Sequence, residues 1–457
     1  MLKVCQQSKD IVLDKIKQGK LDAIAMSNSS FVDDIILTMY NMNILNCLYD
    51  SFNDKRHHNA HTPFDLVIAL SIASKMKLKT SLSDIPYAIQ DHRLLSSIGY
   101  NIVDKNGDGL MSEGTIRHLI GKYSWEELFD YYNRTIQDFI MPRLDIKPNI
   151  HILDCTNIEV NLNNDNYEQS TIAIDKHGDV ARGYKLSTIR GIVNDVGIIE
   201  DIRFGTLKTH DLALSKDMLE TTKCFNSGDI LINDRGFISR ELTNFLKTKR
   251  NVDTYIPLKK NMEAYKIAIS VARKENNWSP HPSGRKHQFI TLVCDLKDYW
   301  ISQKHNDDVP INACVVHDTK YDKYYAFATT DTKRSAKEIV QIYELRPEIE
   351  EDYRQLKEDF WKLEDFKSTK INVISFHIVC VLFGYLFYQL YLMTSEGEKY
   401  VGKSLPIIAK NYQLKQFAYL ILYVDEYFCI FSFIEFVDYF SNCDEQTKGL
   451  LRNFLTI

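Results

Sequence analysis

The spacing of apolar positions changes twice along the chain. Up to about Pro148, apolar residues recur at three- and four-residue intervals, as in Phe64–Lys75 and Trp125–Ile140. This period is typical of helices with one buried face. Signals for β-strands are nearly absent in this stretch. The pattern therefore predicts a helical N-terminal domain over residues 1–148.

After Pro148 the apolar positions alternate, which is typical of strands. The pattern predicts an α/β domain over residues 149–370, in the order three strands, helix, strand, helix, strand. The strands are expected at Asn149–Val160, Lys185–Asn194, Val196–Phe204, Asp229–Asp234 and Thr254–Leu258, with helices at about His210–Thr222 and Ser239–Lys247. A β-rich insertion is expected at about 262–331, because apolar segments there are separated by turn residues.

Helical periodicity returns at Ser335, which forms a predicted capping box with Glu338, and residues 371–457 are expected to be a helical C-terminal region. Within it, Val373–Met393 contains no Asp, Glu, Lys or Arg and is long enough to span a membrane. His377, Gln389 and three tyrosines favour the alternative, a helix buried in the core of a soluble domain.

Composition narrows the class of protein. The chain has 457 residues, of which 44% are apolar and 26% charged, so two or three soluble domains are expected. A net charge of −5 means that any contact with nucleic acid must be local. The stretch Arg240–Lys286 has eleven Lys or Arg against four acids, which indicates either a phosphate-binding surface or a solvated basic face. Nine scattered cysteines without a C-x-x-C pair fit reduced thiols in a cytosol.

Two local motifs near the end of the N-terminal domain have either a structural or a functional interpretation. Ser112 is expected to cap a helix that contains Arg117, His118 and Lys122, either a DNA-recognition helix or an ordinary amphipathic helix. The turn that begins at Asp104 resembles half of a calcium-binding loop. Its twelfth position is Thr115 rather than a glutamate, so we interpret it as a polar turn.

Two of the predicted strands end in the same pattern, I-x-I-x-D, at Asp154 and Asp234. Side chains alternate across a strand, so each aspartate lies on the face of two isoleucines, which is the face most suited to burial. A buried carboxylate is costly unless it is hydrogen-bonded, ion-paired or bound to a metal. The alternative for either residue alone is a cap on the following turn.

A third polar group lies on the segment 343–357. On an ideal helix, Tyr343, Arg346, Glu350, Arg354 and Lys357 fall within an arc of about 80°. One face thus collects a carboxylate and three cations. Pro347 is expected to break the helix and to push Arg346 away from helical geometry.

The spacing Y-x-x-R-x-x-x-E-x-x-x-x-x-x-K in this segment resembles the signature of the bacterial insertion-sequence family four transposases. Asp154 in LDCT and Asp234 in INDRGF are similar to that family's first and second catalytic aspartates. The separations are 234 − 154 = 80 and 350 − 234 = 116 residues. The resemblance covers about Asn149 to the end of the chain. It implies an RNase H-like catalytic core with the β-rich insertion before the third acid, Glu350.

The resemblance implies a DDE transposase that cleaves DNA at transposon ends and transfers the strand into target DNA. Asp154, Asp234 and Glu350 would be the catalytic residues and would hold two Mg²⁺ or Mn²⁺ ions, while Tyr343, Arg346, Arg354 and Lys357 would contact DNA. A hairpin intermediate is also implied. We further expect a cytoplasmic protein whose N-terminal domain binds the element's terminal repeats and whose C-terminal region serves a homodimer.

Three other functions remain as alternatives at this point. The same fold and acids would serve a stand-alone metal-dependent nuclease without strand transfer. A transposase-derived protein that binds DNA without catalysis is disfavoured by the presence of all three acids. A membrane protein would rest on Val373–Met393 alone.

Overall fold

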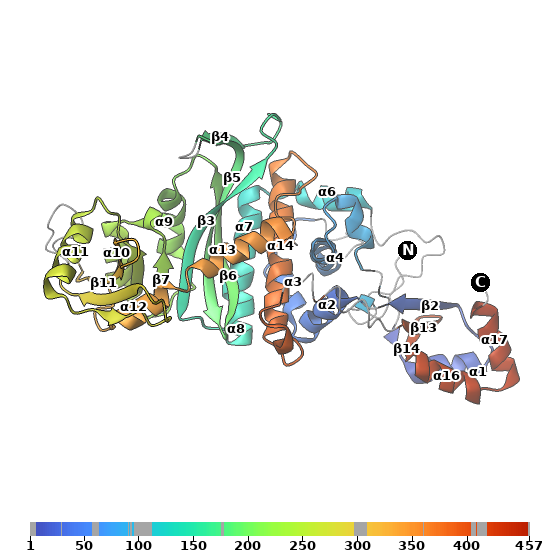
Figure 1. Ribbon diagram of the computed structural model, residues 1–457. Coiled ribbons are helices and arrows are strands. Elements are labelled where there is room, and N and C mark those ends of the chain that lie inside the picture. Colours follow the sequence, from blue (N-terminus) through green and yellow to red (C-terminus); the bar gives the residue numbers. More distant parts are fainter. Residues whose placement is uncertain are drawn as a thin grey trace. The chain divides into compact units, whose positions relative to one another are not determined.

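A computed structural model describes residues 6–28, 30–56, 64–89, 91, 94–95, 112–174, 178–296, 309–359, 361–403, 408 and 418–455. The chain divides into two compact units (Figure 1). One consists of residues 132–355. The other combines residues 1–131 with residues 356–457.

The unit of residues 132–355 is built on one mixed sheet, which has ten strands in the part of the chain that the structure describes. The strands are β3 (Ile150–Val160), β4 (Thr171–Ile174), β5 (Val180–Val193), β6 (Val196–Thr206), β7 (Ile230–Asn233), β8 (Asp253–Pro257), β9 (Ser279–Pro280), β10 (Gln288–Val293), β11 (Asn312–Asp318) and β12 (Lys323–Thr329). The helices are η2 (Thr135–Ile140), α8 (Met141–Leu144), α9 (Asp211–Thr221), η3 (Arg235–Phe237), α10 (Arg240–Phe245), η4 (Leu246–Arg250), α11 (Glu263–Glu275), α12 (Ala336–Tyr343) and α13 (Pro347–Arg354).

The centre of this sheet has the strand order β6-β5-β3-β7-β8 (Figure 1). Strands β6, β5 and β3 are antiparallel neighbours, whereas β7 and β8 run parallel to β3. Helix α9 connects β6 to β7, and α10 with η4 connects β7 to β8. The predicted order of three strands, helix, strand, helix, strand is thus confirmed for the centre of the sheet, but a further strand, β4, lies between β3 and β5 in the sequence and was not predicted. Because β3 and β7 are parallel, their carboxyl ends meet at the same edge of the sheet.

One apolar core supports both the centre of the sheet and the insertion. Leu153 and Leu231, from β3 and β7, are fully buried together with Leu242 of α10. The same cluster continues through Ala268 of α11 and Val315 of β11. The β-rich insertion therefore shares its core with the strands that bear the two aspartates, and its position relative to them is fixed by packing.

The predicted insertion of strands alone is wrong at its start, where residues 263–275 form helix α11. Ala264, Ala268 and Ala272 are buried along one face of this helix. Small residues at four-residue spacing allow the helix to approach the sheet closely, and this signal is easily masked by the alternating segments that follow. Strands β10, β11 and β12 confirm the remainder of the prediction.

The second unit contains a group of helices and a small sheet. Its elements are β1 (Gln6–Gln7), α1 (Lys9–Lys17), β2 (Ala23–Asn28), α2 (Phe31–Asn41), α3 (Ile44–Asp50), α4 (Phe64–Met76), η1 (Leu82–Tyr87), α6 (Glu113–Ile120), α7 (Trp125–Arg134), η6 (Gln355–Asp359), α14 (Ile371–Leu392), η7 (Glu398–Tyr400), β13 (Ala418–Val424), β14 (Tyr427–Ser432), α16 (Phe433–Asn442) and α17 (Glu445–Leu455). Helices α7 and η6 are continuous with the first unit at its two boundaries.

Helix α14 is the apolar segment long enough to cross a membrane. Within the protein, 83% of its most apolar window is buried, and it packs against α4 and α2. His377 Nε2 donates to the main-chain oxygen of Lys362 at 2.9 Å, so one nitrogen of this buried ring has a partner inside the unit. These contacts are those of a core helix, as predicted.

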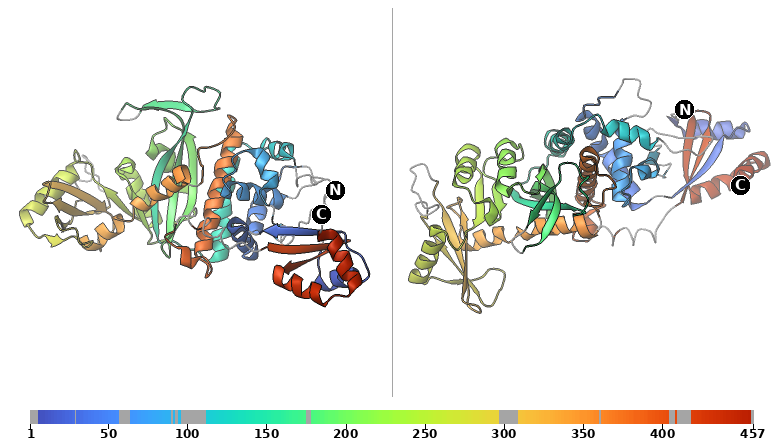
Figure 2. Two further views of the ribbon diagram at one scale, coloured as in Figure 1. Left: turned by 45° about the vertical axis from the view of Figure 1, so that its right-hand side comes forward. Right: turned by 90° about the horizontal axis from the view of Figure 1, so that it is seen from above.

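The prediction that both ends of the chain are helical is incomplete. Strands β1 and β2 pair with a hairpin of β13 and β14 in the order β1-β14-β13-β2, so early and late segments lie side by side (Figure 2). The segment 418–424, AYLILYV, is almost wholly apolar, and such a run does not distinguish a strand from a buried helix. Its partner strand lies about 400 residues earlier, beyond any local pattern.

Two predicted local motifs have different outcomes. Ser112 caps α6, because its Oγ accepts the backbone N–H of Thr115 at 3.3 Å, so the helix is confirmed. Arg117 on this helix pairs with Glu113 one turn earlier. A role for α6 in reading DNA stays a prediction. The turn at Asp104–Gly109 lies outside the described residues.

A buried ionic network joins the amino-terminal ends of the central strands. His151 on β3 contacts Glu200 of β6 through Nδ1 at 2.7 Å and Asp229, directly before β7, through Nε2 at 3.1 Å. All three residues are buried. Burial lowers the pKa of His151, but the charges and hydrogen bonds of Glu200 and Asp229 outweigh it and raise the pKa to about 9. The His151 imidazolium thus provides the positive charge that two buried carboxylates, Glu200 and Asp229, contact.

We predict that His151→Gln destabilises the protein by about 3 kcal/mol at pH 6, because breaking a buried charge pair leaves its partners uncompensated. The pKa of this group is 6.5 without the network and about 9 in the folded protein. Its stabilisation is therefore complete below about pH 6.5 and is lost as the pH rises through about 9. Urea unfolding of both proteins between pH 6 and 10 checks this. Parallel curves across that range would contradict the assignment.

Candidate active site

The two predicted aspartates lie directly after the point where the parallel pairing of β3 and β7 stops, Asp154 within β3 and Asp234 just beyond β7. Strands β3 and β7 pair with Leu153 beside Asn233, so Asp154 and Asp234 are the next positions on each strand. The side chain of Asp154 is 15% exposed and that of Asp234 is 40% exposed. Both strands are buried on both faces before the aspartates, and their parallel pairing brings one mostly buried carboxylate and one half-exposed carboxylate to the same edge of the sheet.

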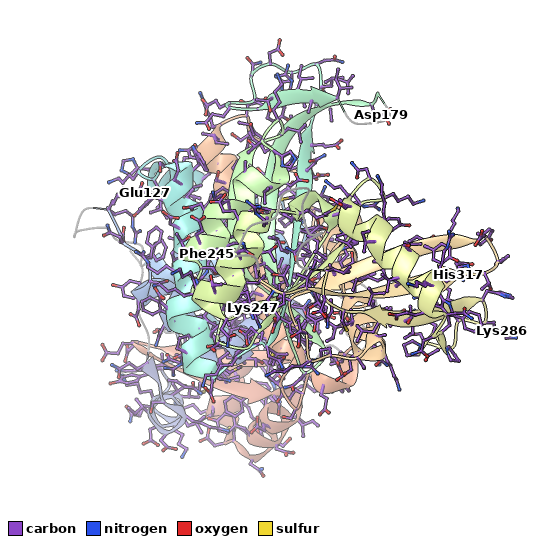
Figure 3. All side chains as sticks on the ribbon, turned by 90° about the vertical axis from the view of Figure 1, so that its left-hand side faces the viewer. Glu127, Asp179, Phe245, Lys247, Lys286 and His317 are labelled. Atoms are coloured by element: carbon purple, nitrogen blue, oxygen red, sulfur yellow. The ribbon has the colours of Figure 1, made fainter. Side chains whose placement is uncertain are left out.

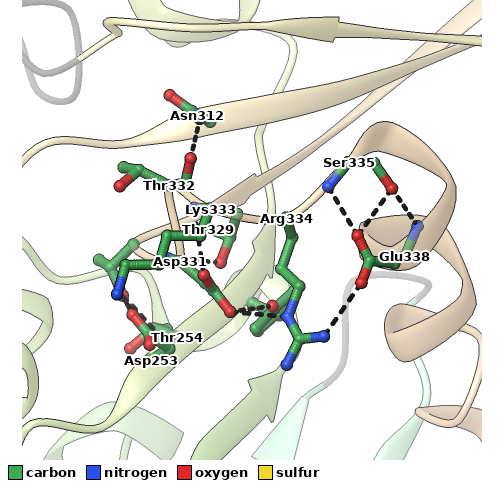
Figure 4. Close-up of polar contacts among 12 residues, drawn as sticks. Asp253, Thr254, Asn312, Thr329, Asp331, Thr332, Lys333, Arg334, Ser335 and Glu338 are labelled. Atoms are coloured by element: carbon green, nitrogen blue, oxygen red, sulfur yellow. Dashed lines mark hydrogen bonds and ion pairs between the residues drawn. The ribbon is translucent and has the colours of Figure 1, made fainter. Parts of the chain in front are cut away.

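The third acid approaches this edge through helices α12 and α13, and Figure 4 shows how α12 begins. Ser335 and Glu338 form the predicted capping box, with Glu338 accepting the backbone N–H of Ser335 at 3.0 Å. Arg334 donates to Asp331 at 3.0 Å and to Glu338 at 3.1 Å. Tyr255 of β8 also donates to Asp331, at 3.1 Å. The start of α12 is therefore tied to the central sheet.

The expected effect of Pro347 on Arg346 is wrong, although the expected break in the helix is confirmed. Helix α12 ends at Tyr343 and α13 starts at Pro347. Arg346 nevertheless keeps helical backbone angles, φ −54° and ψ −40°. Proline at the first position of a helix removes a donor that has no partner in any case, and the helical region is disfavoured rather than forbidden before proline. Arg346 and Glu350 consequently remain one turn apart on the same face.

Arg346 links the first and third acids. Its Nη2 contacts Asp154 Oδ2 at 2.9 Å, and its Nη1 contacts Glu350 Oε1. The side chain of Arg346 is 16% exposed, whereas that of Glu350 is 58% exposed. The structure thus brings Asp154 and Glu350 to one cation, although they are 196 residues apart in sequence (350 − 154).

Electrostatics at this edge favour a positive charge. Burial raises the pKa of Asp154 to about 6, although Arg346 and the backbone N–H of Cys155 oppose the rise, and the nearby charge of Asp234 adds to it. The Cys155 N–H donates to Asp154 Oδ1 at 2.9 Å. A carboxylate that is both desolvated and close to a second carboxylate is stabilised in its ionised form by a cation.

A cleft of about 560 Å³ extends from Asp234 toward the β-rich insertion. Tyr343 lies in its wall, with its ring centre 4.4 Å from that of Phe327 on β12. The remaining wall is rich in cations and aromatic rings: Arg235, Lys260, Arg285, Arg346, Tyr265, Tyr324 and Tyr325. Such a lining suits an anionic ligand that carries flat rings.

Two cations of the predicted polar face, Arg354 and Lys357, contact other acids than Asp154, Asp234 and Glu350. Arg354 forms a two-point contact with Glu351, at 2.8 and 2.7 Å, rather than the pairing with Glu350 that the spacing allowed. Glu351, the acidic residue next to Glu350, is thus paired with Arg354. Lys357 lies in the other compact unit, where it contacts Glu364 at 3.2 Å.

The basic stretch 240–286 is spread over several elements. Figure 3 shows Lys247 beside α10 and Lys286 at the far end of the insertion, close to His317. Lys247 also pairs with Asp253 at 2.7 Å. The local surplus of charge in the sequence therefore does not correspond to one continuous stripe through these two lysines.

The acids have the donor chemistry of a site for hard divalent ions. Asp154, Asp234 and Glu350 offer carboxylate oxygens only, which Mg²⁺ and Mn²⁺ prefer. Among the residues that the structure describes, no three His, Cys, Asp or Glu side chains are grouped closely enough to hold an ion as they stand. Arg346 lies between two of the three acids. The three carboxylates thus fit a metal site in type, and in this structure two of them contact the same guanidinium.

The sequence patterns missed two residues that contact the site. Arg235, two-thirds exposed, lies 4.0 Å from the Asp234 carboxylate. Tyr353 on α13 donates its hydroxyl to the main-chain oxygen of Asp154 at 3.0 Å. Arg235 belongs to the INDRGF segment, so its adjacency was a usable signal. Tyr353 lies in the apolar row of α13, where nothing local distinguishes it from a core residue.

Comparison with known proteins agrees with this geometry. Residues 147–387 match the family described as transposase DDE domain, which is more than half of the chain and includes the two aspartates and Glu350. No curated protein matches the chain. Members of this family are polynucleotidyl transferases that act on DNA and generally use divalent metal ions. The chain belongs to the transposase DDE domain family.

Proposed function

We propose that this protein cuts DNA at the ends of a bacterial insertion sequence and transfers the freed strand into target DNA, by a cut-and-paste route. The observation that supports this most directly is the link from Asp154 through Arg346 to Glu350, with Asp234 on the adjoining strand. The first and third acids contact one guanidinium, and the second follows the strand that pairs with β3, all inside the matched domain. The Y-x-x-R-x-x-x-E-x-x-x-x-x-x-K spacing favours the insertion-sequence family four type.

The central sheet favours an RNase H-like core. Three antiparallel strands followed by two strands parallel to the first, in the order β6-β5-β3-β7-β8, give the first and second acids on neighbouring strands. The third acid then comes from a helix after the insertion. This arrangement supports assignment of Asp154, Asp234 and Glu350 as the catalytic residues.

In the proposed site, Asp154, Asp234 and Glu350 would hold two Mg²⁺ or Mn²⁺ ions. Such an ion pair, when bound, stabilises the attacking and leaving oxygens of an in-line phosphoryl displacement. Arg346 would turn from the acids to a DNA phosphate, because the same guanidinium suits carboxylates and phosphates alike. Arg235 and Tyr343, beside Asp234 in the cleft wall, would contact the flanking backbone.

The main alternatives are a nuclease without strand transfer and a DNA-binding protein without catalysis. A homodimer in the synaptic complex, terminal repeats as substrate, a hairpin intermediate and a cytoplasmic location belong to the proposal as a whole. An assay with labelled end DNA and a supercoiled target separates the alternatives. Joined products support the transposase, cleavage alone supports the nuclease, and binding alone supports the third function.

We predict that Asp154→Asn, Asp234→Asn and Glu350→Gln each abolish cleavage of end DNA with Mg²⁺ while binding to that DNA is retained. Carboxylates that hold metal act on the transition state more than on docking. Glu351→Gln is the matched control, because it removes an adjacent carboxylate that engages Arg354, and it should cut at nearly the normal rate. Loss of cleavage in Glu351→Gln with retention in Glu350→Gln would transfer the role to Glu351.

A separate prediction concerns the cations. Arg235→Ala and Arg354→Ala should each weaken binding to end DNA and reduce the slope of log affinity against log salt by about 0.9, the contribution of one neutralised phosphate. Lys223→Ala is the control, because this lysine is exposed and paired with Asp138. Affinities measured across a salt series check the prediction. An unchanged slope for Arg354→Ala would limit that residue to its ion pair with Glu351.

A further inference from the structure

Helix α13 is held to the sheet by a buried arginine. Arg190 of β5 donates to Glu348 at 2.8 Å and to Asp352, both on α13. Arg190 and Asp352 are each 5% exposed. A buried guanidinium is tolerated only with such paired acceptors, and two carboxylates one turn apart match its fork of donors.

Strand β6, which pairs with β5, has a glycine where the Arg190 side chain passes. A Cβ atom at Gly197 of β6 would lie 2.1 Å from Arg190 Nη2, so no larger residue fits there without displacing the guanidinium. Gly197 thus provides the space in which the Arg190 side chain reaches α13. The close approach makes the position of the guanidinium, and of the helix bound to it, narrowly defined.

Glu348 and Asp352 precede and follow Glu350 by two residues. At about 100° per residue, each is about 160° away from Glu350 around the helix. Arg190 therefore holds the side of α13 opposite to the proposed metal ligand. Glu350 is left 58% exposed on the free side.

A second contact ties the same helix to the first aspartate itself. The Tyr353 hydroxyl donates to the main-chain oxygen of Asp154 at 3.0 Å and lies 2.6 Å from the Thr188 hydroxyl on β5. Tyr353 is 7% exposed. This bond connects the backbone of one proposed ligand to the helix that carries another.

We infer that Arg190 and Tyr353 are positioning residues, which set the separation of Glu350 from Asp154 at the value that metal binding requires. This role rests on the proposed function of the three acids. Groups that orient metal ligands without touching the metal typically account for 10–100-fold in metal affinity. The contacts of both residues are made to the protein, Arg190 to Glu348 and Asp352 and Tyr353 to the main chain of Asp154, so in this proposal both act through the placement of α13.

Tyr353→Phe tests the role with the smallest change, because removal of Arg190 would leave two buried carboxylates unpaired and threaten folding. We expect Tyr353→Phe to bind Mn²⁺ about ten-fold more weakly than the wild type, as measured from the electron paramagnetic resonance of free Mn²⁺ without DNA. Its affinity for end DNA without divalent ions should be unchanged. Cleavage should require a correspondingly higher Mn²⁺ concentration.

Tyr132→Phe is the matched control. Tyr132 is a buried tyrosine of the same unit whose hydroxyl also donates to a main-chain oxygen, that of Ile199, at 3.0 Å. Both variants should lose similar thermal stability, but only Tyr353→Phe should lose Mn²⁺ affinity. Equal Mn²⁺ affinity in the two variants would overturn the positioning role.

Asp154→Asn tests the underlying site independently. If it binds Mn²⁺ as the wild type does, the proposed metal site is wrong, and the positioning role with it. If Asp154→Asn loses Mn²⁺ but Tyr353→Phe does not, the metal site stands and only the positioning role is overturned.

Discussion

The interaction on which the site depends is the pairing of a desolvated carboxylate with a cation. Asp154 is mostly buried, lies next to Asp234, and has a pKa raised to about 6 even with Arg346 in contact. Without positive charge this end of β3 would be electrostatically unfavourable. The parallel pairing of β3 and β7 places two carboxylates close together, so a positive charge is needed there. Arg346, directly before α13, provides this charge.

The same balance of charge explains why the segment around α13 is rich in acidic and basic residues. The helix bears four acids within five residues, Glu348, Glu350, Glu351 and Asp352, yet each has a basic partner in the structure. Arg190 pairs with Glu348 and Asp352 on the side that faces the sheet. Arg346 pairs with Glu350 near Asp154, and Arg354 pairs with Glu351. A sequence that looks like a solvated charged helix is in fact engaged on several sides, which makes its register against the sheet specific.

Sequence patterns predicted the features that depend on neighbouring residues or on a repeated motif. Asp154 and Asp234 stand out because two buried strands end alike, and Glu350 stands out through its spacing from Arg346. Local patterns could not predict the role of Arg190, because the two acids that it contacts lie about 160 residues later in the sequence. The small sheet was missed for the same reason, because β2 finds its partner β13 near the other end. Helix α11 was missed because its alanine face is a weak apolar signal beside strong strands.

The pairing of β2 with β13 also bears on how the protein is made. Ala23 faces Tyr423, so the ribosome must add 400 residues (423 − 23) after the first strand before its partner exists. At about 5–20 residues per second this takes roughly 20–80 s, during which the β2 edge is unpaired. The unit of residues 132–355 needs no such wait, because its strands are contributed by one continuous stretch. The ten-stranded sheet can therefore assemble on the ribosome while the small sheet still lacks half of its strands.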